Sequence, residues 1–405
     1  MEHPACIVVG AGPAGAMLSL LLARRGVSVH LLEEHADFER DFRGDTVHPS
    51  TLEVLDHIGL ADDLLKLPHG EMSRFTLETP DGVVEVARLE SAGGRFPFVA
   101  LLPQARFLEY VTAHAAHYPS FQLTMRAHVH ELLEEGGAVC GVRVRDGAGF
   151  REFRAPLVVA ADGRFSRLRA LSGLQTVSSS APMDVLWFRL PKKESDPADA
   201  GLFAVGGGGL VVTLTRPTDW QVGLIIPKGG YAQLKQQGLE AVRTRMARIK
   251  PLFADRLDAL HDWHQVSLLS VESSRVTCWH RPGLLLIGDA AHVMTPVGGV
   301  GINVAIQDAV AAAELLEAPL LAGRVTDADL AAVQDAREWA ARVTQFIQRQ
   351  AQNTIVAPLL ATDPEHFRLP LRARVLFALL RHLPFLKRIP AHFVARGLGF
   401  RLPRR

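Results

Sequence analysis

Three glycines near the start of the chain have the spacing that binds the pyrophosphate of a dinucleotide. Gly10, Gly12 and Gly15 follow a short apolar run and precede an apolar segment with helical character. Glycine lets the backbone turn tightly, approach a phosphate closely and pack a helix against a sheet, and the N-terminus of that helix offers free N–H donors. The spacing alone is weak evidence, because a glycine-rich surface turn has a similar composition.

A carboxylate completes this unit. Glu33 ends the second apolar run, about 20 residues beyond the glycines, where an acid can accept both hydroxyls of an adenosine ribose. Residues 5–9, 17–24 and 27–32 have the apolar patterns of a strand, a helix and a second strand. This order predicts dinucleotide binding, but it does not distinguish NAD from FAD.

A second glycine-rich stretch, in the last third of the chain, favours FAD. A strand is expected over 283–287, followed by Gly288 and Asp289, and an alanine-rich helix is expected over 301–316. An acid at the carboxyl end of a strand can bind a polyol, and a helix N-terminus can face a ring that becomes anionic on reduction. The ribityl chain and the isoalloxazine of FAD match these requirements. Taken alone, Asp289 would more simply be a helix cap.

A third motif, residues 161–169 (Ala-Asp-Gly-Arg-Phe-Ser-Arg-Leu-Arg), lies between the other two. By itself, Asp162-Gly163 after the apolar run 157–160 would be a turn at a strand end. In this order the three motifs resemble those of the class A flavoprotein monooxygenases, the FAD-dependent aromatic hydroxylases typified by para-hydroxybenzoate hydroxylase, over nearly the whole chain. The resemblance implies that the third motif lies near FAD and the nicotinamide route, with its acid and arginine organising the loop.

The resemblance also implies contacts to FAD from outside these motifs. Arg43 matches an arginine that touches FAD, although a solvated surface arginine is the alternative, and Gln104 matches a side chain that contacts the flavin. Pro296, Gly298 and Gly299 are expected beside the flavin ring. The residues expected to bind FAD are Gly10, Gly12, Pro13, Ala14, Gly15, Glu33, Arg43, Gln104, Asp162, Gly288, Asp289, Pro296, Gly299, Gly301, Ile302 and Asn303.

The resemblance implies a monooxygenase mechanism centred on the flavin. The chain has a single Gly-x-Gly-x-x-Gly unit, so the nicotinamide has no dinucleotide domain of its own, and the resemblance implies that NADH or NADPH visits only transiently. The reduced flavin would then add O2 to give a flavin-4a-hydroperoxide, which hydroxylates or epoxidises an electron-rich ring. No catalytic side chain is expected, since the cofactor carries the chemistry and the protein supplies orientation and a dry site.

Substrate contacts are expected from a second domain facing the flavin. The apolar candidates are Trp187, Phe188, Phe203, Trp220 and Phe98, although each is more simply a core residue. The chain has only three tyrosines, and the substrate-binding arginine and tyrosine pair of the type member cannot be placed on it. This disfavours a small benzoate and favours a larger, less polar aromatic or polycyclic substrate.

Two other flavin activities remain open. An FAD-dependent reductase or epoxidase of isoprenoid-type substrates shares the first two motifs and also needs an apolar cavity. A flavin-dependent halogenase shares the fold, but its Trp-x-Trp-x-Ile-Pro motif is missing, and the nearest stretch is 220–223.

The elements that position these residues predict an α/β protein. Its centre is a Rossmann-like FAD-binding domain of the para-hydroxybenzoate hydroxylase type, with an inserted antiparallel-sheet substrate domain where apolar and polar residues alternate, and a C-terminal helical segment. The expected boundaries are 1–75, 100–180 and 265–350 for the FAD-binding domain, 76–99 and 181–264 for the substrate domain, and 351–405 for the C-terminal helical cover.

Local patterns predict individual elements of these domains. Helices are expected over 50–65 and 104–117, and strands over 210–214 and 222–226. Residues 75–86 are expected to form a hairpin, because they alternate around an Asp-Gly pair.

Composition limits the class of protein. The formal net charge of +1 provides no field that would recruit nucleic acid or an anionic membrane. Cys6, Cys140 and Cys278 lack C-x-x-C spacing, which suits a reducing cytosol and excludes a disulfide framework or a cysteine-rich zinc site. No apolar run approaches the ~20 residues that span a bilayer. We expect a cytoplasmic enzyme without a metal, either a monomer or a homodimer.

The tail from 367 to 405 is rich in Arg, Leu and Phe and is interrupted by prolines. Such a stretch can lie on an anionic membrane, or it can cover the protein with its apolar face inward. We favour the cover.

Overall fold

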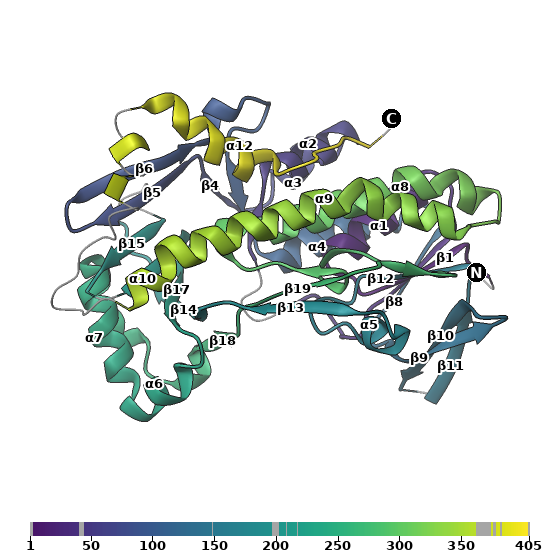
Figure 1. The fold of residues 1–405 in the computed structure, drawn as a ribbon, viewed down its shortest axis with the longest axis horizontal. Helices are drawn as coiled ribbons and strands as arrows, with labels where there is room; N and C mark the ends of the chain where they lie inside the picture. The colour runs from purple at the N-terminus through teal and green to yellow at the C-terminus, as the bar shows by residue number, and fades with distance from the viewer. Residues whose placement is uncertain are drawn as a thin grey trace.

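The computed structural model describes residues 3–39, 44–147, 149–196, 202–207, 209–216, 218–361, 374–375, 378–380 and 383–403. Two large sheets organise this part of the chain, and the long helix α9 (Asp327–Ala351) runs from one to the other (Figure 1).

The first large sheet has six strands in the order β20-β21-β12-β1-β2-β8, parallel except at β20. Its strands are β1 (Cys6–Val9), β2 (Val29–Leu32), β8 (Phe121–Thr124), β12 (Leu157–Ala160), β20 (His280–Arg281) and β21 (Leu284–Leu286). The helices that pack with it include α1 (Pro13–Arg24), α4 (Gln104–Ala115) and α8 (Gly301–Leu321). The central strands are apolar throughout because they are buried on both faces.

Parallel strands bring the expected cofactor residues to one edge of this sheet. Gly10 follows β1 and donates its N–H to Leu32 at the end of β2 (2.7 Å). Ala161, after β12, donates to Val9 (2.8 Å), and Ile287, after β21, donates to Ala160 (3.0 Å). All three motifs therefore begin side by side, as the Rossmann-like prediction requires.

The second large sheet has seven strands in the order β18-β14-β17-β16-β15-β5-β6, antiparallel except between β15 and β5. Its strands are β5 (Arg74–Thr79), β6 (Gly82–Arg88), β14 (Met183–Pro191), β15 (Phe203–Gly206), β16 (Gly209–Thr215), β17 (Asp219–Pro227) and β18 (Ser267–Leu269). Helices α6 (Tyr231–Gln237) and α7 (Leu239–Ile249) pack on one of its faces. The hairpin of β5 and β6 confirms the Asp-Gly turn prediction.

The other strands, helices and single turns with described bounds complete this part of the fold. The remaining strands are β3 (Thr46–Val47), β4 (Gly70–Met72), β7 (Val99–Leu101), β9 (His128–Glu135), β10 (Ala138–Asp146), β11 (Gly149–Arg154), β13 (Thr176–Ser180), β19 (Glu272–Val276) and β22 (His292–Val293). The remaining α-helices are α2 (Pro49–His57), α3 (Ala61–Leu64), α5 (Arg167–Ser172), α9 (Asp327–Ala351), α10 (Ala357–Leu360) and α12 (Arg388–Arg396). Single turns are η1 (Leu89–Ala92), η2 (Pro251–Phe253), η3 (Leu257–Ala259), η4 (Trp263–Gln265), η5 (Gly288–Ala290), η6 (Val297–Gly299), the π-helical η7 (Gln352–Val356) and η9 (Pro384–Lys387).

The single helix expected over 50–65 is wrong, because the structure has two helices there. Gly59 has φ of +79°, a left-handed conformation that ends α2 and that glycine adopts without a Cβ penalty. The chain then turns into the short α3. Apolar residues keep a helical spacing on both sides of Gly59, so the sequence pattern gave no sign of the turn.

Helix α8 confirms the helix expected over 301–316 and extends it to Leu321. The stretch Val297–Leu321 is long and apolar enough to cross a membrane, but 72% of its apolar window is buried inside the molecule. It packs between α1 and α9 (Figure 1). Its apolar composition therefore matches that of a core helix.

The described part of the tail lies on the body of the protein. Helix α12 buries Ala391, Val394 and Ala395, and the chain then runs along α9 (Figure 1). Ion pairs join Lys387 to Glu85 and Arg396 to Glu53, each at 3.1 Å. Both ion pairs attach the described part of the tail to the body of the protein, while residues 362–373, 376–377, 381–382 and 404–405 lie outside the described part, so the cover stays a prediction.

Candidate active site

The first glycine turn has the close contacts that exclude side chains. Gly10 has φ of +96°, and a Cβ on it would lie 2.5 Å from the carbonyl oxygen of Ala161. A Cβ on Gly15 would lie 2.0 Å from the carbonyl oxygen of Gly10. By contrast, a Cβ on Gly12 would meet nothing within 4 Å. Gly12 therefore leaves open space at the N-terminus of α1, which suits the approach of a pyrophosphate.

Glu33 is tied to this turn. Its carboxylate accepts the N–H of Ala11 at 2.9 Å, and it also accepts the backbone N–H of His35 at 3.0 Å and contacts the ring Nδ1 of His35 at 2.7 Å. The side chain thus joins the end of β2 to the glycine turn.

Asp162 organises the third motif locally. Its carboxylate accepts the hydroxyl of Ser166 at 2.5 Å and the backbone N–H of Leu168 at 3.0 Å, in the first turn of α5. Burial raises the pKa of Asp162, and these hydrogen bonds only partly oppose that effect. The acid therefore shapes the loop, as the family resemblance implies, and its contact with FAD stays a prediction.

Arg169 connects the third motif to the second. One guanidinium nitrogen donates to the backbone carbonyls of Asp289 and Ala290, at 3.1 and 3.0 Å, and another donates to that of Arg164 at 2.5 Å. The fork of donors bridges two loops that are distant in sequence. The arginine of the third motif thus organises the loop, as the resemblance implies.

Gly288 lies where two helices meet. It has φ of +58°, and a Cβ on it would lie 3.2 Å from the Cβ atoms of both Ala14 and Ala305. A side chain at this position would push α1 and α8 apart. The first and second motifs are therefore in direct contact.

Asp308, on α8, holds this turn from beneath. Its carboxylate accepts the backbone N–H of Gly288 at 3.0 Å, contacts Nε2 of His292 at 2.6 Å, and accepts Nε–H of Arg337 at 2.9 Å. The Asp308, His292 and Arg337 side chains are 1% exposed or less. Burial works to raise the pKa of Asp308, but His292 and Arg337 outweigh it, so the pKa lies below its usual value.

Asp308 follows the second motif in the sequence, but neither Asp308 nor Arg337 is among the residues expected to bind FAD. An acid flanked by apolar residues early in α8 is the sign that points to Asp308, because a buried charge needs a partner. The partner Arg337 lies on α9 among other charged residues, so no local pattern distinguishes it.

Residues 296–301 form a tight loop before α8, which we call the flavin loop. Gly298 and Gly299 have φ of +82° and +65°, conformations that favour glycine. Gly301 begins α8, whose first turn leaves N–H groups without helical partners. This arrangement has the fixed donors that the sequence predicts beside a flavin ring.

The stretch before α2 lies against the start of α8. A Cβ on Gly44 would be 2.9 Å from Cδ1 of Ile302. The carboxamide oxygen of Asn303 accepts the hydroxyl of Ser50, so this side chain is directed to α2. Arg43, one residue before Gly44, lies outside the described residues, and its expected contact stays a prediction.

Gln104 begins α4 as expected, and its backbone N–H donates to the carboxylate of Asp45 at 3.3 Å. The same carboxylate is paired with Arg216, which follows β16 of the second sheet. Burial raises the pKa of Asp45, whereas Arg216 works to lower it. This ion pair joins the segment before β3 to the end of β16.

The five aromatic candidates divide among different surroundings. Phe188 and Trp220 are buried with α6 and α7, on the face of the second sheet away from the flavin loop. Trp187 and Phe203 are partly buried on the opposite face, in an apolar cluster that includes Val297 of the flavin loop. Phe98 packs on the core of the first sheet. Only Trp187 and Phe203 therefore share a cluster with the loop.

Trp187 is placed by a glycine on the neighbouring strand. Gly223 pairs with Trp187 across β14 and β17, and a Cβ on Gly223 would lie 2.9 Å from the indole ring. The absence of a side chain at Gly223 leaves room for the indole ring beside β17. Trp187 thus contributes apolar surface to the cluster that includes Val297.

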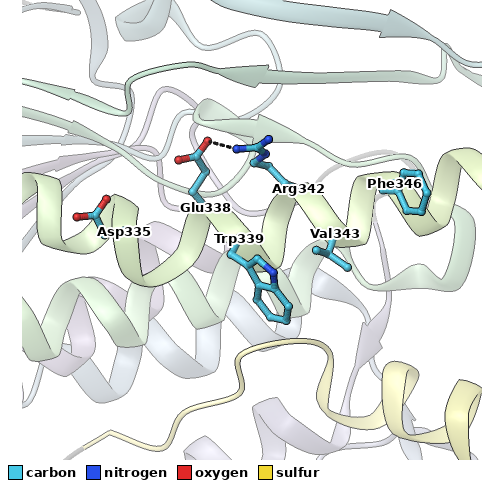
Figure 2. A pocket seen from close by; sticks show the side chains of 6 residues that line it. All are labelled: Asp335, Glu338, Trp339, Arg342, Val343 and Phe346. Carbon is cyan, nitrogen blue, oxygen red and sulfur yellow. Dashed lines mark ion pairs between the residues drawn. The ribbon is translucent and has the colours of Figure 1, made fainter.

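An open hollow of about 550 Å³ lies elsewhere, over the outer face of α9. Figure 2 shows Trp339 pointing from α9 toward the C-terminal segment, and an ion pair of 3.7 Å between Glu338 and Arg342. The hollow is lined by Asp335, Glu338, Trp339, Arg342, Val343 and Phe346. It shares no residue with the three motifs. Among the described residues, no group of three His, Cys, Asp or Glu side chains is placed to hold a metal.

Comparison with known proteins identifies the family. A family model described as "FAD binding domain" matches residues 3–347. The 6-methylpretetramide 4-monooxygenase of Streptomyces rimosus is 34% identical over 358 residues, which cover 87% of this chain and 85% of that protein. Pentachlorophenol 4-monooxygenase of Sphingobium chlorophenolicum is 26% identical, and the match covers 75% of this chain and 56% of that longer protein.

Solved structures agree on the fold. Anhydrotetracycline hydroxylase from Streptomyces rimosus is 25% identical with a TM-score of 0.77, covering 99% of this chain and 80% of that one. The p-nitrophenol 4-monooxygenase of Pseudomonas putida DLL-E4 has a TM-score of 0.78 at 22% identity, covering 98% and 100%. The chain belongs to the class A flavoprotein monooxygenases. It is an FAD-dependent oxidoreductase that hydroxylates an aromatic substrate, and the predicted fold class is confirmed.

Proposed function

We propose that this monooxygenase hydroxylates a fused-ring aromatic phenol, with NADH or NADPH as the reductant. The observation that carries the proposal is the apolar cluster of the second sheet that includes Val297 of the flavin loop. Its partly buried members are Val84, Val86, Trp187, Phe203, Val212, Leu269, Val297, Ile355, Leu360 and Leu386. Such an apolar surface beside the flavin loop would suit an extended apolar ring system, because burial of apolar surface drives its binding.

The positions of the tyrosines support the same choice. Tyr110 and Tyr118 pack on the core of the first sheet, and Tyr231 packs beside α7 on the other face of the second sheet. None of them belongs to the cluster with Val297. A small, polar benzoate would therefore find no phenol group there. Relatives named for 6-methylpretetramide and anhydrotetracycline likewise favour a polycyclic substrate.

We assign the cofactor contacts along the edge of the first sheet. In this proposal the glycine turn and α1 bind the pyrophosphate, Glu33 accepts the ribose hydroxyls, and Asp289 accepts hydroxyls of the ribityl chain. The flavin loop lies beside the ring. Arg43, Gln104 and Asp162 add the contacts that the resemblance implies. Titration of the apoenzyme with FAD tests this, and Asp289→Ala should weaken binding by about 10- to 100-fold, the loss of one or two charge-assisted hydrogen bonds.

The side chains of the protein take no covalent part in this reaction. When bound and reduced, FAD supplies the electrons that activate O2. The apolar lining orients the substrate and excludes water, and the N–H groups at the start of α8 stabilise negative charge near the ring. We propose that the enzyme works in the cytoplasm, as a monomer or a homodimer.

Product analysis tests the substrate class. The holoenzyme is mixed with NADH or NADPH and O2, and with a four-ring polyphenol, 1-naphthol, para-nitrophenol or 4-hydroxybenzoate. We expect the polyphenol to accelerate nicotinamide oxidation most and to give a product heavier by one oxygen atom. A preference for 4-hydroxybenzoate would overturn the proposal.

The same assay separates two alternatives. A digeranylgeranylglycerophospholipid reductase of Methanococcoides burtonii is 25% identical over 320 residues, and a reductase would return a hydrogenated product. A flavin-dependent brominase with a TM-score of 0.73 at 17% identity shares the fold alone. A halogenase would give a brominated product when bromide is added.

A further inference from the structure

His48 lies between the flavin loop and the C-terminal helix α12. Its Nδ1 is 2.8 Å from the carbonyl oxygen of Val394, and its Nε2 is 3.0 Å from the carbonyl oxygen of Gly299. The residue is only 2% exposed. It also precedes α2, where its own carbonyl accepts the N–H of Thr51 at 2.9 Å. His48 thus joins its own segment, before α2, to the flavin loop and to α12, which are far from it in sequence.

Both ring contacts of His48 are with hydrogen-bond acceptors. A neutral imidazole has one N–H and donates to one carbonyl at a time, whereas an imidazolium donates to both. Burial lowers the pKa of His48, although the two carbonyls oppose that effect. Both carbonyls lie within hydrogen-bond distance of the ring, so His48 can donate to either of them, or to both when it is protonated.

Each contact satisfies a carbonyl that has a structural role. Val394 lies in the last turn of α12, where carbonyls lack helical partners. Gly299 lies in the flavin loop, and a trans peptide directs its C=O and the next N–H to opposite sides. A bond from His48 to the carbonyl of Gly299 thus turns the N–H of Val300 away from His48. The contact sets the orientation of this peptide.

Helix α12 and the flavin loop also touch beside His48. A Cβ on Gly298 would lie 3.7 Å from the ring of Phe393, and a Cβ on Gly397 would lie 3.3 Å from the side-chain nitrogen of Asn303. The end of α12 therefore packs along the loop and the first turn of α8. His48 is the buried polar link in this contact.

We propose that His48 is a positioning residue for FAD, which fixes the Gly299 carbonyl of the flavin loop and fastens α12 against that loop. The conformation of the loop and the seating of the C-terminal helix are thereby coupled through one side chain. The inference depends on FAD binding, which the family shows, and not on the identity of the substrate.

Two amide variants separate the two contacts. The side-chain nitrogen of asparagine takes the approximate place of Nδ1, and that of glutamine takes the place of Nε2. His48→Asn therefore keeps the bond to Val394, His48→Gln keeps the bond to Gly299, and His48→Leu keeps neither. His392→Gln is the matched control, because His392 is an exposed histidine on α12.

Two measurements that do not involve turnover report on the two contacts. The Kd of FAD for the apoenzyme reports on the flavin loop, and hydrogen exchange of amides 388–397 reports on α12. We expect His48→Leu to weaken FAD binding by about tenfold and to speed exchange in α12 by about tenfold, as for one lost buried hydrogen bond. His48→Gln should restore the FAD affinity alone, and His48→Asn the protection of α12 alone.

Rescue of one property by one amide is a result that simple loss of packing would not give. Equal effects of His48→Asn and His48→Gln on both measurements would overturn the proposal. Wild-type behaviour of His48→Leu would do the same. If His48→Leu does not fold, the contrast between the two amide variants decides.

Discussion

The two ends of the candidate FAD site are built in different ways. At the end assigned to adenosine, the glycine turn and Glu33 belong to one strand–helix–strand unit and touch each other directly. At the end assigned to the flavin, the loop is held by His48 from before α2 and by Asp308 from within α8. Arg337 and Val394 extend these contacts to α9 and α12. A local sequence motif can specify the adenosine end. The flavin end, in contrast, needs contacts between segments that come together only when the chain folds.

Asp308→Asn should have the largest effect on the flavin end. The change leaves the buried Arg337 guanidinium without its countercharge, and breaking a buried ion pair costs about 3–5 kcal/mol. The Gly288 turn should loosen as well, so FAD binding should weaken. Chemical denaturation of the apoenzyme and FAD titration measure the two effects. Asp335→Asn is the control, since Asp335 is an exposed acid on α9.

The pH dependence of this variant adds a further check. The pKa of Asp308 is lowered in the folded protein, so its contribution to stability is full above the unfolded value of 3.8 and is lost as the pH falls through the folded pKa. The difference in stability between wild type and Asp308→Asn should therefore be constant near neutral pH and shrink below pH 3.8. A difference that grows in acid would contradict the assigned charge.

Gly15→Ala and Gly12→Ala should separate folding from binding at the adenosine end. The added Cβ at Gly15 collides with a backbone oxygen and forces α1 away from β1, which we expect to cost about 3 kcal/mol. The added Cβ at Gly12 meets nothing, and its extended backbone suits any residue, so stability should change by less than about 0.5 kcal/mol. Gly12→Ala should still weaken FAD binding, by about tenfold, if the pyrophosphate approaches there. Thermal unfolding of the apoenzyme and FAD titration give the two values, and equal stability of the variants would contradict the packing argument.

The same difference explains what the sequence could predict. Strands over 5–9 and 157–160 and the helix over 104–117 were predictable, because apolar periodicity is a local property, and β1, β12 and α4 match these bounds to within about two residues. The broken helix at Gly59 was not predictable, since a single glycine is tolerated inside many helices.

The contacts of the flavin end required the structure. His48 and Arg337 have neighbours in sequence that reveal nothing about their partners, because those partners lie on α12 and α8. Phe188 and Trp187 are adjacent in sequence, yet they face opposite sides of the sheet, because side chains alternate along a strand. Phe188 is therefore a core residue, whereas Trp187 is a candidate substrate contact. Amino-acid composition does not show which face of the strand points toward the flavin loop.

Glu53→Gln should have the smallest effect and tests how α12 is held. Glu53 and Arg396 form an ion pair of 3.1 Å, but the two side chains are 14% and 29% exposed. Partly solvated pairs contribute about 1 kcal/mol or less, because water and salt screen them. Hydrogen exchange of α12 should therefore change by less than about fivefold, and less again in high salt. If Glu53→Gln instead freed α12 more than His48→Leu, the surface ion pair rather than the buried histidine would be the main attachment of the C-terminal helix.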